Sequence, residues 1–158
     1  MSSLVHGPSV VTGGVHFRVW APRTHRVAIH AGGGHQPLEA SGGGWFEGLL
    51  PGAGDGTVYA LALDEGRVRP DPASRRQPDG VHSASQVFDV RRHPWQDAAW
   101  KGIPRADLVF HELHVGTFTP EGTLDAAAAR LPDLVELGVT CVELMPVQPF
   151  PGDRNWGY

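Results

Sequence analysis

The sequence predicts a chain with two structural parts, an antiparallel β-sandwich followed by a βαβ unit of a parallel α/β fold. The first prediction rests on short stretches between residues 15 and 63, in which apolar and polar residues alternate and glycine-rich turns intervene. The second rests on apolar residues at helical spacing, which lie between two short apolar stretches within residues 108–146. We therefore assign residues 1–90 to the sandwich, 91–106 to a linker and 107–158 to the α/β part.

Alternation of apolar and polar residues predicts the strands of the sandwich. Residues 1–14 are expected to form a loose lead-in or to pair at the edge of a sheet. The predicted strands after this lead-in are residues 16–20, 26–30, 45–50 and 57–63. Several short antiparallel strands at this spacing are typical of a sandwich.

The stretch from residue 69 to residue 89 contains three prolines, which is too many for a helix or a central strand. We expect an extended segment on the surface, closed by a strand at residues 86–90. In the linker that follows, Trp95 and Trp100 are expected to fill the seam between the two parts.

The α/β part is expected to consist of a strand at residues 108–115, a helix at 124–137 and a strand at 139–146. Thr123 is a suitable N-cap, Gly138 a suitable left-handed stop, and Pro132 should kink or restart the helix. The helix is expected to face the sheet through Leu124, Ala128, Leu131 and Val135. In parallel α/β folds the chemistry lies where the strands end, here at residues 114–120 and 146–158.

Composition excludes several classes of partner. Charged residues make up 19% of the 158 residues and hydrophobic residues 41%, which indicates a globular protein. The net charge of −4 does not suit nucleic acid or an anionic membrane, so a neutral partner is expected. The start of the chain does not read as a secretion signal, and Cys141, the single cysteine, lies in an apolar stretch as a small buried hydrophobe. These features predict a cytoplasmic protein.

The letters HELH at residues 111–114 suggest a metal site, but their spacing argues against one. A zinc helix motif needs two histidines four positions apart on a helix. His111 and His114 are three apart on a predicted strand, so they should point to opposite faces. We expect no metal here.

Two stretches of the α/β part resemble a known family. HELHVGTFTPEGTLDAAAARL, from residue 111, and ELGVTCVELMPVQPFPGDRNWGY, from residue 136, resemble the opening of the catalytic barrel in the alpha-amylase superfamily. RPDPASRRQPDGVHSASQVFD, from residue 69, resembles the corresponding segment of the malto-oligosyltrehalose trehalohydrolases within that superfamily. The resemblance covers most of residues 15–158. It implies an immunoglobulin-like sandwich, similar to a carbohydrate-binding module, followed by the first βαβ unit of a truncated (β/α)8 TIM barrel.

The same resemblance implies a glycoside hydrolase that releases trehalose from malto-oligosyltrehalose by retaining cleavage of an α-1,4 bond. Its substrate would be a malto-oligosaccharide or α-glucan, and no cofactor is implied. The catalytic carboxylates of the family come from later barrel strands, so this chain alone should be inactive. The alternatives are a glycogen branching or isoamylase-type debranching enzyme, and a non-catalytic glucan-binding module.

Within this chain, the resemblance places substrate contacts mainly in the terminal loop. Tyr158, in NWGY, corresponds to a tyrosine that stacks on the sugar ring being cleaved. Asp153, Arg154 and Asn155 could hydrogen-bond sugar hydroxyls, although packing within the loop is the favoured interpretation of these three residues. His114 could line the site at the end of the first barrel strand, although a structural histidine is the simpler interpretation.

Glu112 and Glu143 are not expected to be the catalytic pair, because the resemblance places that pair in later strands. They are instead expected to be buried or half-buried groups that brace the barrel. In the sandwich, Trp20, Trp45 and Tyr59 could stack on pyranose rings. Packing in the core or between domains is the favoured interpretation, with the sandwich acting as a structural support.

Overall fold

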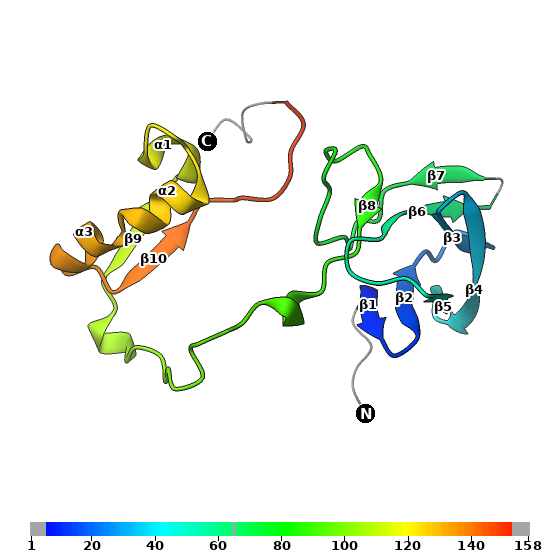
Figure 1. Ribbon diagram of the computed structural model, residues 1–158, viewed down its shortest axis with the longest axis horizontal. Coiled ribbons are helices and arrows are strands. Elements are labelled where there is room, and N and C mark those ends of the chain that lie inside the picture. The colour runs from blue at the N-terminus through cyan, green and yellow to red at the C-terminus, as the bar shows by residue number, and fades with distance from the viewer. Residues whose placement is uncertain (1–5, 65, 153–158) are drawn as a thin grey trace. The chain divides into compact units, whose positions relative to one another are not determined.

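The computed structural model describes residues 6–64 and 66–152. It divides into two compact units, Met1–Pro94 and Trp95–Tyr158, which we describe separately (Figure 1). The boundary between the units lies inside the predicted linker. A 3₁₀ helix, η1 (Val90–Arg92), ends the first unit, and its Arg91 guanidinium donates a 2.8 Å hydrogen bond to the carbonyl of Val10.

The first unit is an antiparallel β domain. Its strands pair in the order β1-β2-β5-β4-β3-β6-β7, and β8 also pairs with β6. The strands are β1 (Gly7–Val11), β2 (Gly14–Trp20), β3 (Val27–Ala31), β4 (Gly34–Gly42), β5 (Trp45–Pro51), β6 (Val58–Leu63), β7 (Arg67–Arg69) and β8 (Ser85–Gln86).

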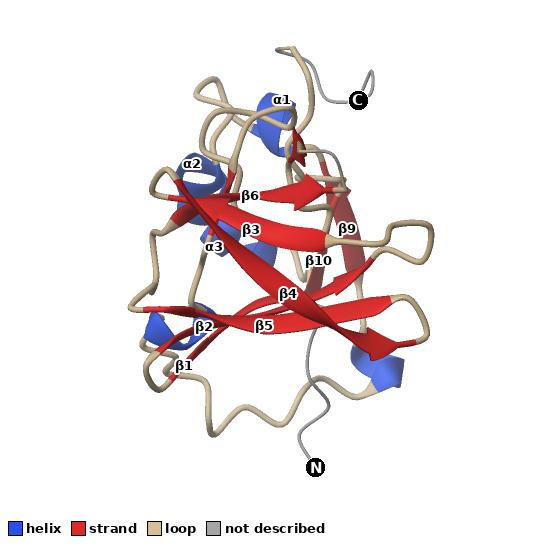
Figure 2. Cartoon of the chain, turned by 90° about the vertical axis from the view of Figure 1, so that its right-hand side faces the viewer, coloured by secondary structure: helices blue, strands red, loops and turns tan. Residues whose placement is uncertain are grey.

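Strand β4 joins two layers of this domain. Its first half pairs with β3, its second half pairs with β5, and the register shifts between Ala40 and Gly42. Figure 2 shows β4 running diagonally from the layer of β3 and β6 to the layer of β1, β2 and β5. The described strands therefore form two connected antiparallel layers.

The core lies between these layers, where the inward positions of each strand meet. On β2, Phe17 is completely buried and contacts the Tyr59 ring of β6 edge-on, with ring centroids 4.8 Å apart. Alternation along the strands sends every second side chain inward, as predicted from the sequence. The buried members of the core cluster are Val15, Phe17, Val19, Val27, Ile29, Leu38, Phe46, Tyr59, Leu61 and Val87.

The strand predictions succeed where the alternation is strong. The four predicted strands correspond to β2, β3, β5 and β6, and edge pairing of the lead-in is confirmed by β1, which pairs with β2. The predicted strand at residues 86–90 is wrong beyond Gln86, because Asp89 instead caps η1 by accepting a hydrogen bond from the Arg91 backbone. Strands β4 and β7 were not predicted, since neither carries a clear apolar alternation.

The second unit contains two parallel strands joined through helices. Strand β9 (Phe110–Leu113) pairs with β10 (Cys141–Leu144), with Glu112 opposite Glu143. Between them lie α1 (Val115–Phe118), α2 (Leu124–Ala129) and α3 (Leu131–Glu136), and the 3₁₀ helix η2 (Arg105–Asp107) precedes β9. The predicted order of strand, helix and strand is present. Its place as the first unit of an eight-stranded barrel stays a prediction.

The ends of the helices follow the signals in the sequence. Thr123 caps α2 by accepting a 3.2 Å hydrogen bond from the Ala126 backbone, and Gly138 ends α3 with a φ of 91°. The helix restarts after Arg130, with Pro132 in the first turn of α3. The short helix α1 was not predicted, because the first strand was expected to continue to Val115.

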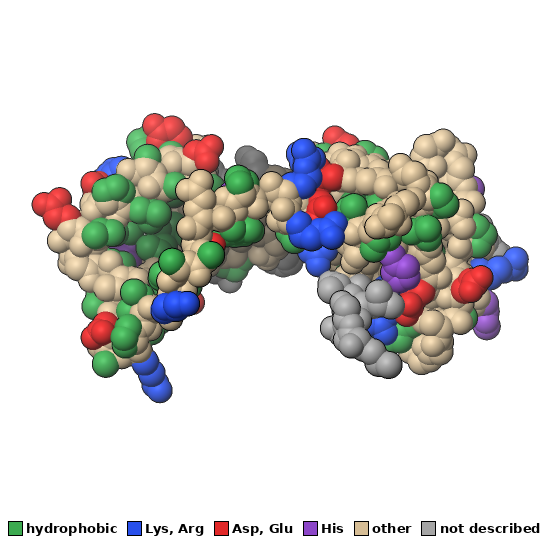
Figure 3. Space-filling model, turned by 60° about the horizontal axis from the view of Figure 1, so that its bottom comes forward, with side chains coloured by type: hydrophobic (Ala, Val, Ile, Leu, Met, Phe, Trp, Pro, Cys, Tyr) green, Lys and Arg blue, Asp and Glu red, His purple; other side chains and the backbone are tan. Residues whose placement is uncertain are grey.

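The predicted buried face of the helices is wrong. Ala127 and Leu134 are the buried residues of α2 and α3, whereas Leu124 is 55% exposed and Val135 is 69% exposed. Residues 126–129 are all alanine, so the apolar stripe is too wide for its spacing to locate the line of contact. Apolar side chains are consequently visible on the surface of this unit (Figure 3).

Two aromatic residues at the start of the second unit are also on the surface. Trp95 is 69% exposed and Trp100 is 67% exposed. Their predicted role at a seam between the two parts stays a prediction. Among the described residues, no helix is long and apolar enough to cross a membrane.

Candidate functional site

His114 lies directly after the carboxyl end of β9, where the sequence predicts substrate contact. Its carbonyl oxygen accepts hydrogen bonds from the backbones of Thr117 (3.1 Å) and Phe118 (2.9 Å), so the residue begins α1. Its ring Nδ1 lies 3.3 Å from the Thr117 hydroxyl oxygen. This local bonding fits the structural interpretation of His114, and its role in substrate binding stays a prediction.

His111 is held in different surroundings from His114. It is half-buried, and its ring lies against the ring of Phe118 with centroids 6.3 Å apart. In the described parts of the chain, no group of three or more His, Cys, Asp or Glu side chains is placed to hold a metal ion. Cys141, on β10, is half-buried rather than buried as predicted.

Glu112 and Glu143 are exposed, which corrects the prediction that they are buried or half-buried. They are paired in register on adjacent parallel strands, so their side chains leave the same face of the two-stranded sheet. Phe110, on this face, is 61% exposed, whereas Leu113, on the other face, is 4% exposed. On the Leu113 face, the His111 ring lies against Phe118 of α1, whereas both glutamates lie on the opposite face and are exposed.

The other predicted contacts lie outside the part of the chain that the structure describes. These are Asp153, Arg154, Asn155 and Tyr158. The described chain after β10 reaches Gly152, and the Met145 backbone donates a 3.0 Å hydrogen bond to the Leu113 carbonyl. This bond holds the first residue after β10 against the end of β9, on the side of the sheet where both strands end.

The three aromatic residues of the β domain lie in three different environments. Tyr59 is 1% exposed and belongs to the core, as favoured from the sequence. Trp45 is half-buried, with the Arg18 guanidinium 4.0 Å from its ring centroid and the His6 ring against its edge. Trp20 is 54% exposed, so packing in the core of its own unit is excluded for this residue.

Charged residues surround Trp45 on the outward face of β2 and β5. Glu47 accepts hydrogen bonds from the Ser41 hydroxyl and from the Arg18 guanidinium, both at 2.9 Å. The Ser41 bond, followed by the attraction of Arg18, lowers the pKa of Glu47 below its usual value. His16 Nε2 lies 3.9 Å from the same carboxylate. The negative charge of Glu47 and the positive charge of Arg18 therefore compensate each other on this face.

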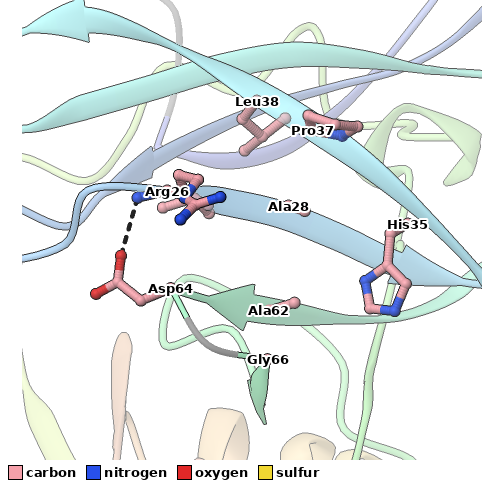
Figure 4. A pocket seen from close by; sticks show the side chains of 9 residues that line it. Arg26, Ala28, His35, Pro37, Leu38, Ala62, Asp64 and Gly66 are labelled. Carbon is pink, nitrogen blue, oxygen red and sulfur yellow. Dashed lines mark hydrogen bonds between the residues drawn. The ribbon is translucent and has the colours of Figure 1, made fainter.

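A small pocket lies on the other layer of the β domain, between β3, β4 and the end of β6 (Figure 4). Ala28 and Ala62 are among its lining residues, together with Arg26, His35 and Asp64. The Asp64 carboxylate accepts the backbone N–H groups of His25 (2.8 Å) and Arg26 (3.0 Å), and these two bonds lower its pKa.

The pocket has a volume of about 220 Å³, which is below the ~300–1,000 Å³ typical of small-molecule sites. Sequence reasoning did not single out its residues. The available signal was alanine at positions 28 and 62, which alternate with the core positions of β3 and β6.

Comparison with known proteins finds relatives among enzymes of the alpha-amylase family. No family model matches the chain. It is 48% identical over 145 residues to the malto-oligosyltrehalose trehalohydrolase of Deinococcus radiodurans, an alignment that covers 92% of this chain and 24% of that protein. It is 30% identical to the 1,4-alpha-glucan branching enzyme GlgB of a Shewanella species, covering 92% of this chain and 23% of that enzyme.

Solved structures agree with these relatives. A crystal structure from Salmonella typhimurium, provisionally named an alpha amylase, superposes with a TM-score of 0.88 at 44% identity, covering 97% of this chain and 26% of that chain. The GBS pullulanase SAP, solved in complex with maltotetraose, has a TM-score of 0.69 at 23% identity, covering 92% of this chain and 24% of that chain. This second likeness shows the fold alone.

The chain spans about a quarter of the length of the curated relatives that it matches. Seven of these share 40–48% identity with it and carry one name. The 158 residues are therefore homologous to the amino-terminal quarter of the malto-oligosyltrehalose trehalohydrolases of the alpha-amylase family.

Proposed function

We propose that the protein containing this chain is a glycoside hydrolase that releases trehalose from malto-oligosyltrehalose. The observation that carries the proposal is the difference in identity between two sets of relatives. Over about nine-tenths of the chain, proteins named trehalohydrolase are 40–48% identical to it, whereas the branching enzyme is 30% identical. Retaining cleavage of an α-1,4 bond, through a covalent glycosyl-enzyme intermediate, is the mechanism that this assignment implies.

The second unit supplies the beginning of the catalytic barrel in this proposal. Its parallel strands β9 and β10 are two of the eight strands that such a barrel needs. Leu137 is 78% exposed and Phe110 is 61% exposed. Such exposed apolar side chains support the presence of further parts of the protein that pack on them, because contiguous apolar surface is normally covered. The catalytic carboxylates would come from the later strands, so the 158-residue chain alone should be inactive.

The substrate in this proposal is a malto-oligosaccharide that ends in trehalose. Tyr158 would stack on a sugar ring, while Asp153, Arg154, Asn155 and His114 would contact its hydroxyl groups. The net charge of −4 suits this neutral ligand better than nucleic acid or a membrane surface. The name of the Shewanella relative, a 1,4-alpha-glucan branching enzyme, supports the same ligand class.

Two other functions remain as alternatives. A branching or debranching enzyme is supported by the Shewanella branching enzyme and, at the level of fold, by the pullulanases. A non-catalytic glucan-binding module is the alternative from a different class. It would lack the later carboxylates, so the sequence that follows Tyr158 in the complete protein distinguishes it from an enzyme.

Product analysis tests the proposal directly. The complete protein is incubated with malto-oligosyltrehalose, and the products are separated by anion-exchange chromatography. Free trehalose and a shortened maltooligosaccharide are expected. Transfer of glucan branches without trehalose would establish the branching activity instead, and substrate binding without any product would establish the module. The 158-residue chain serves as the inactive control.

A further inference from the structure

Two histidines face each other across the hairpin of β3 and β4. His30 and His35 pair in register, and the turn between them has Gly32 and Gly33 at its centre. Both glycines have positive φ, at 56° and 79°, as a two-residue hairpin turn that matches the twist of its strands requires. Such a turn is closed by a hydrogen-bonded pair of residues, so the next pair, the two histidines, is of the closer, non-hydrogen-bonded kind. The turn therefore fixes the two imidazoles as neighbours.

The separation of these two rings matches that of two imidazoles on one metal ion. Their centroids lie 4.6 Å apart, and their planes are inclined by 46°. Metal–nitrogen bonds of ~2.0–2.1 Å, with an angle of ~90–110° between them, would place the centroids of two coordinated imidazoles about 4.5–5.2 Å apart. The pair therefore needs little movement to bind an ion between its rings.

One nitrogen of the pair has no hydrogen bond to the described residues. His30 is half-buried, and its Nδ1 atom is buried and unpartnered in this part of the chain. A buried polar atom normally has a partner, because losing water without replacing its hydrogen bond costs free energy. A metal ion would satisfy this nitrogen, since coordination uses the lone pair of a neutral imidazole. His35 is exposed and its ring reaches from β4 toward β3 (Figure 4), so it can turn aside to admit the ion.

The surroundings of the pair determine which ions it suits. Ile29 belongs to the core, so His30 leaves the outward face of β3. The described neighbours on that face are Ala28, Pro37 and Ala60, whose side chains carry no ligand atom. The protein thus offers two imidazole nitrogens, and water would complete the coordination. Imidazole suits Zn²⁺, Ni²⁺ and Cu²⁺, whereas Mg²⁺ and Ca²⁺ take oxygen ligands.

We propose that His30 and His35 bind one divalent transition-metal ion of the class of Zn²⁺ across this hairpin. Two protein ligands imply reversible binding, with a dissociation constant on the order of 1–100 µM, which is weaker than that of structural sites with four ligands. A bound ion would join β3 to β4 beside their turn and would stabilise the folded β domain by mass action. The site does not depend on the proposed hydrolase activity.

Zinc titration followed by histidine NMR tests this site. ZnCl₂ is added to the ¹⁵N-labelled 158-residue chain, produced without a histidine tag, and the imidazole signals are assigned with single His→Gln variants. Saturable shifts of the His30 and His35 signals are expected, together with a melting temperature that rises with the zinc concentration. His35→Gln should weaken binding at least about tenfold, because even groups that only support a metal ligand contribute that much. His35 is exposed, so this variant should keep the fold.

His16→Gln is the matched control, because His16 Nε2 lies 3.9 Å from the Glu47 carboxylate and this pair is the competing site for zinc. It should leave the affinity unchanged, and MgCl₂ should shift neither His30 nor His35. The proposal is overturned if those two signals stay unshifted at ~1 mM ZnCl₂. Equal affinity in His35→Gln, lost affinity in His16→Gln, or an equal response to MgCl₂ would also overturn it. The parent titration needs no substitution, so instability of a variant cannot hide the answer.

Discussion

The phenol of Tyr59 donates a 2.7 Å hydrogen bond to the carboxylate of Asp71, and each of these residues is only 1% exposed. The other Asp71 oxygen accepts the Ala73 backbone N–H at 2.8 Å, and the Asp71 backbone donates to the Ser85 hydroxyl at 2.9 Å. Tyr59 belongs to β6, so this network fastens the proline-containing segment that follows β7 to the core of the β domain.

Tyr59→Phe should therefore destabilise the chain although it keeps the ring against Phe17. The substitution leaves a buried carboxylate oxygen without its donor, which should cost about 1–3 kcal/mol in the free energy of unfolding. Urea unfolding followed by circular dichroism measures the loss. Tyr59→Phe combined with Asp71→Asn is the control for coupling: if the two single losses simply add, the hydrogen bond does not contribute as described.

The same pair predicts a loss of stability at alkaline pH. Burial, followed by the negative charge of Asp71, raises the pKa of Tyr59 well above its ordinary value of 10.0. Its stabilising effect is complete below pH 10, where folded and unfolded chains both hold the phenol proton. Above this pH only the unfolded chain loses the proton, so stability falls as the pH rises. Unfolding midpoints measured from pH 8 to 12 should show a smaller decline in Tyr59→Phe than in the parent chain.

Asp64 should stabilise the end of β6 through its side-chain oxygen. The residue has a φ of 41°, and its carboxylate accepts the backbone N–H groups of His25 and Arg26. Asn tolerates this backbone conformation and keeps an accepting oxygen, whereas Ala loses both properties. Asp64→Ala should consequently lower the melting temperature more than Asp64→Asn does. Equal melting temperatures would show that the two hydrogen bonds contribute little.

The lowered pKa of Asp64 also predicts how the stability of the chain changes at acid pH. The two backbone hydrogen bonds lower this pKa below 3.8, so its stabilising effect is present above that pH and disappears as the pH falls through the lowered pKa. Melting temperatures of the parent chain and Asp64→Asn, compared at pH 6 and pH 2, should differ more at pH 6. A difference in melting temperature that is larger at pH 2 than at pH 6 would contradict this prediction.

The turn beside Trp20 offers a matched pair of glycine substitutions. Gly43 and Gly44 both have positive φ, at 60° and 81°, so alanine should cost roughly 1–2 kcal/mol at each. At Gly44 the new Cβ would also lie 2.6 Å from Pro22, whereas at Gly43 the nearest atom is 3.7 Å away. Gly44→Ala should thus lose about 1–3 kcal/mol more, by overpacking. Equal unfolding free energies would show that the turn adjusts to make room for the added methyl group.

In the complete protein, Tyr158→Ala should reduce turnover more than stability if the proposed function is correct. An aromatic ring under the reacting sugar can favour the flattened transition state over the ground-state chair. Its loss should lower kcat/KM by on the order of 2–4 kcal/mol, and Tyr158→Phe, which keeps the ring, should lower it much less. Steady-state kinetics beside thermal melts measure both effects. Activity that declines only in step with the melting temperature would assign the residue to loop packing.

Several elements could be read directly from short stretches of sequence. Alternation gave the positions of β2, β3, β5 and β6, because every second residue of a strand on a covered sheet is buried. Thr123, Pro132 and Gly138 marked the helix ends correctly, because capping and proline effects depend on residues within one turn. For the site, the sequence placed His114 at the carboxyl end of the first strand, and in the structure the residue lies directly after β9.

Other features were decided by contacts between distant residues. Strand β4 has little alternation of its own and exists through its pairing with both β3 and β5. Glu112 and Glu143 became neighbours only through the register of β9 and β10, and both lie exposed on one face of these strands. Trp20 and Tyr59 are both aromatic residues of predicted strands, yet the packing of two layers covers Tyr59 and leaves Trp20 open. Local sequence sets which way a side chain leaves its strand, but only the surrounding layers determine whether anything covers it.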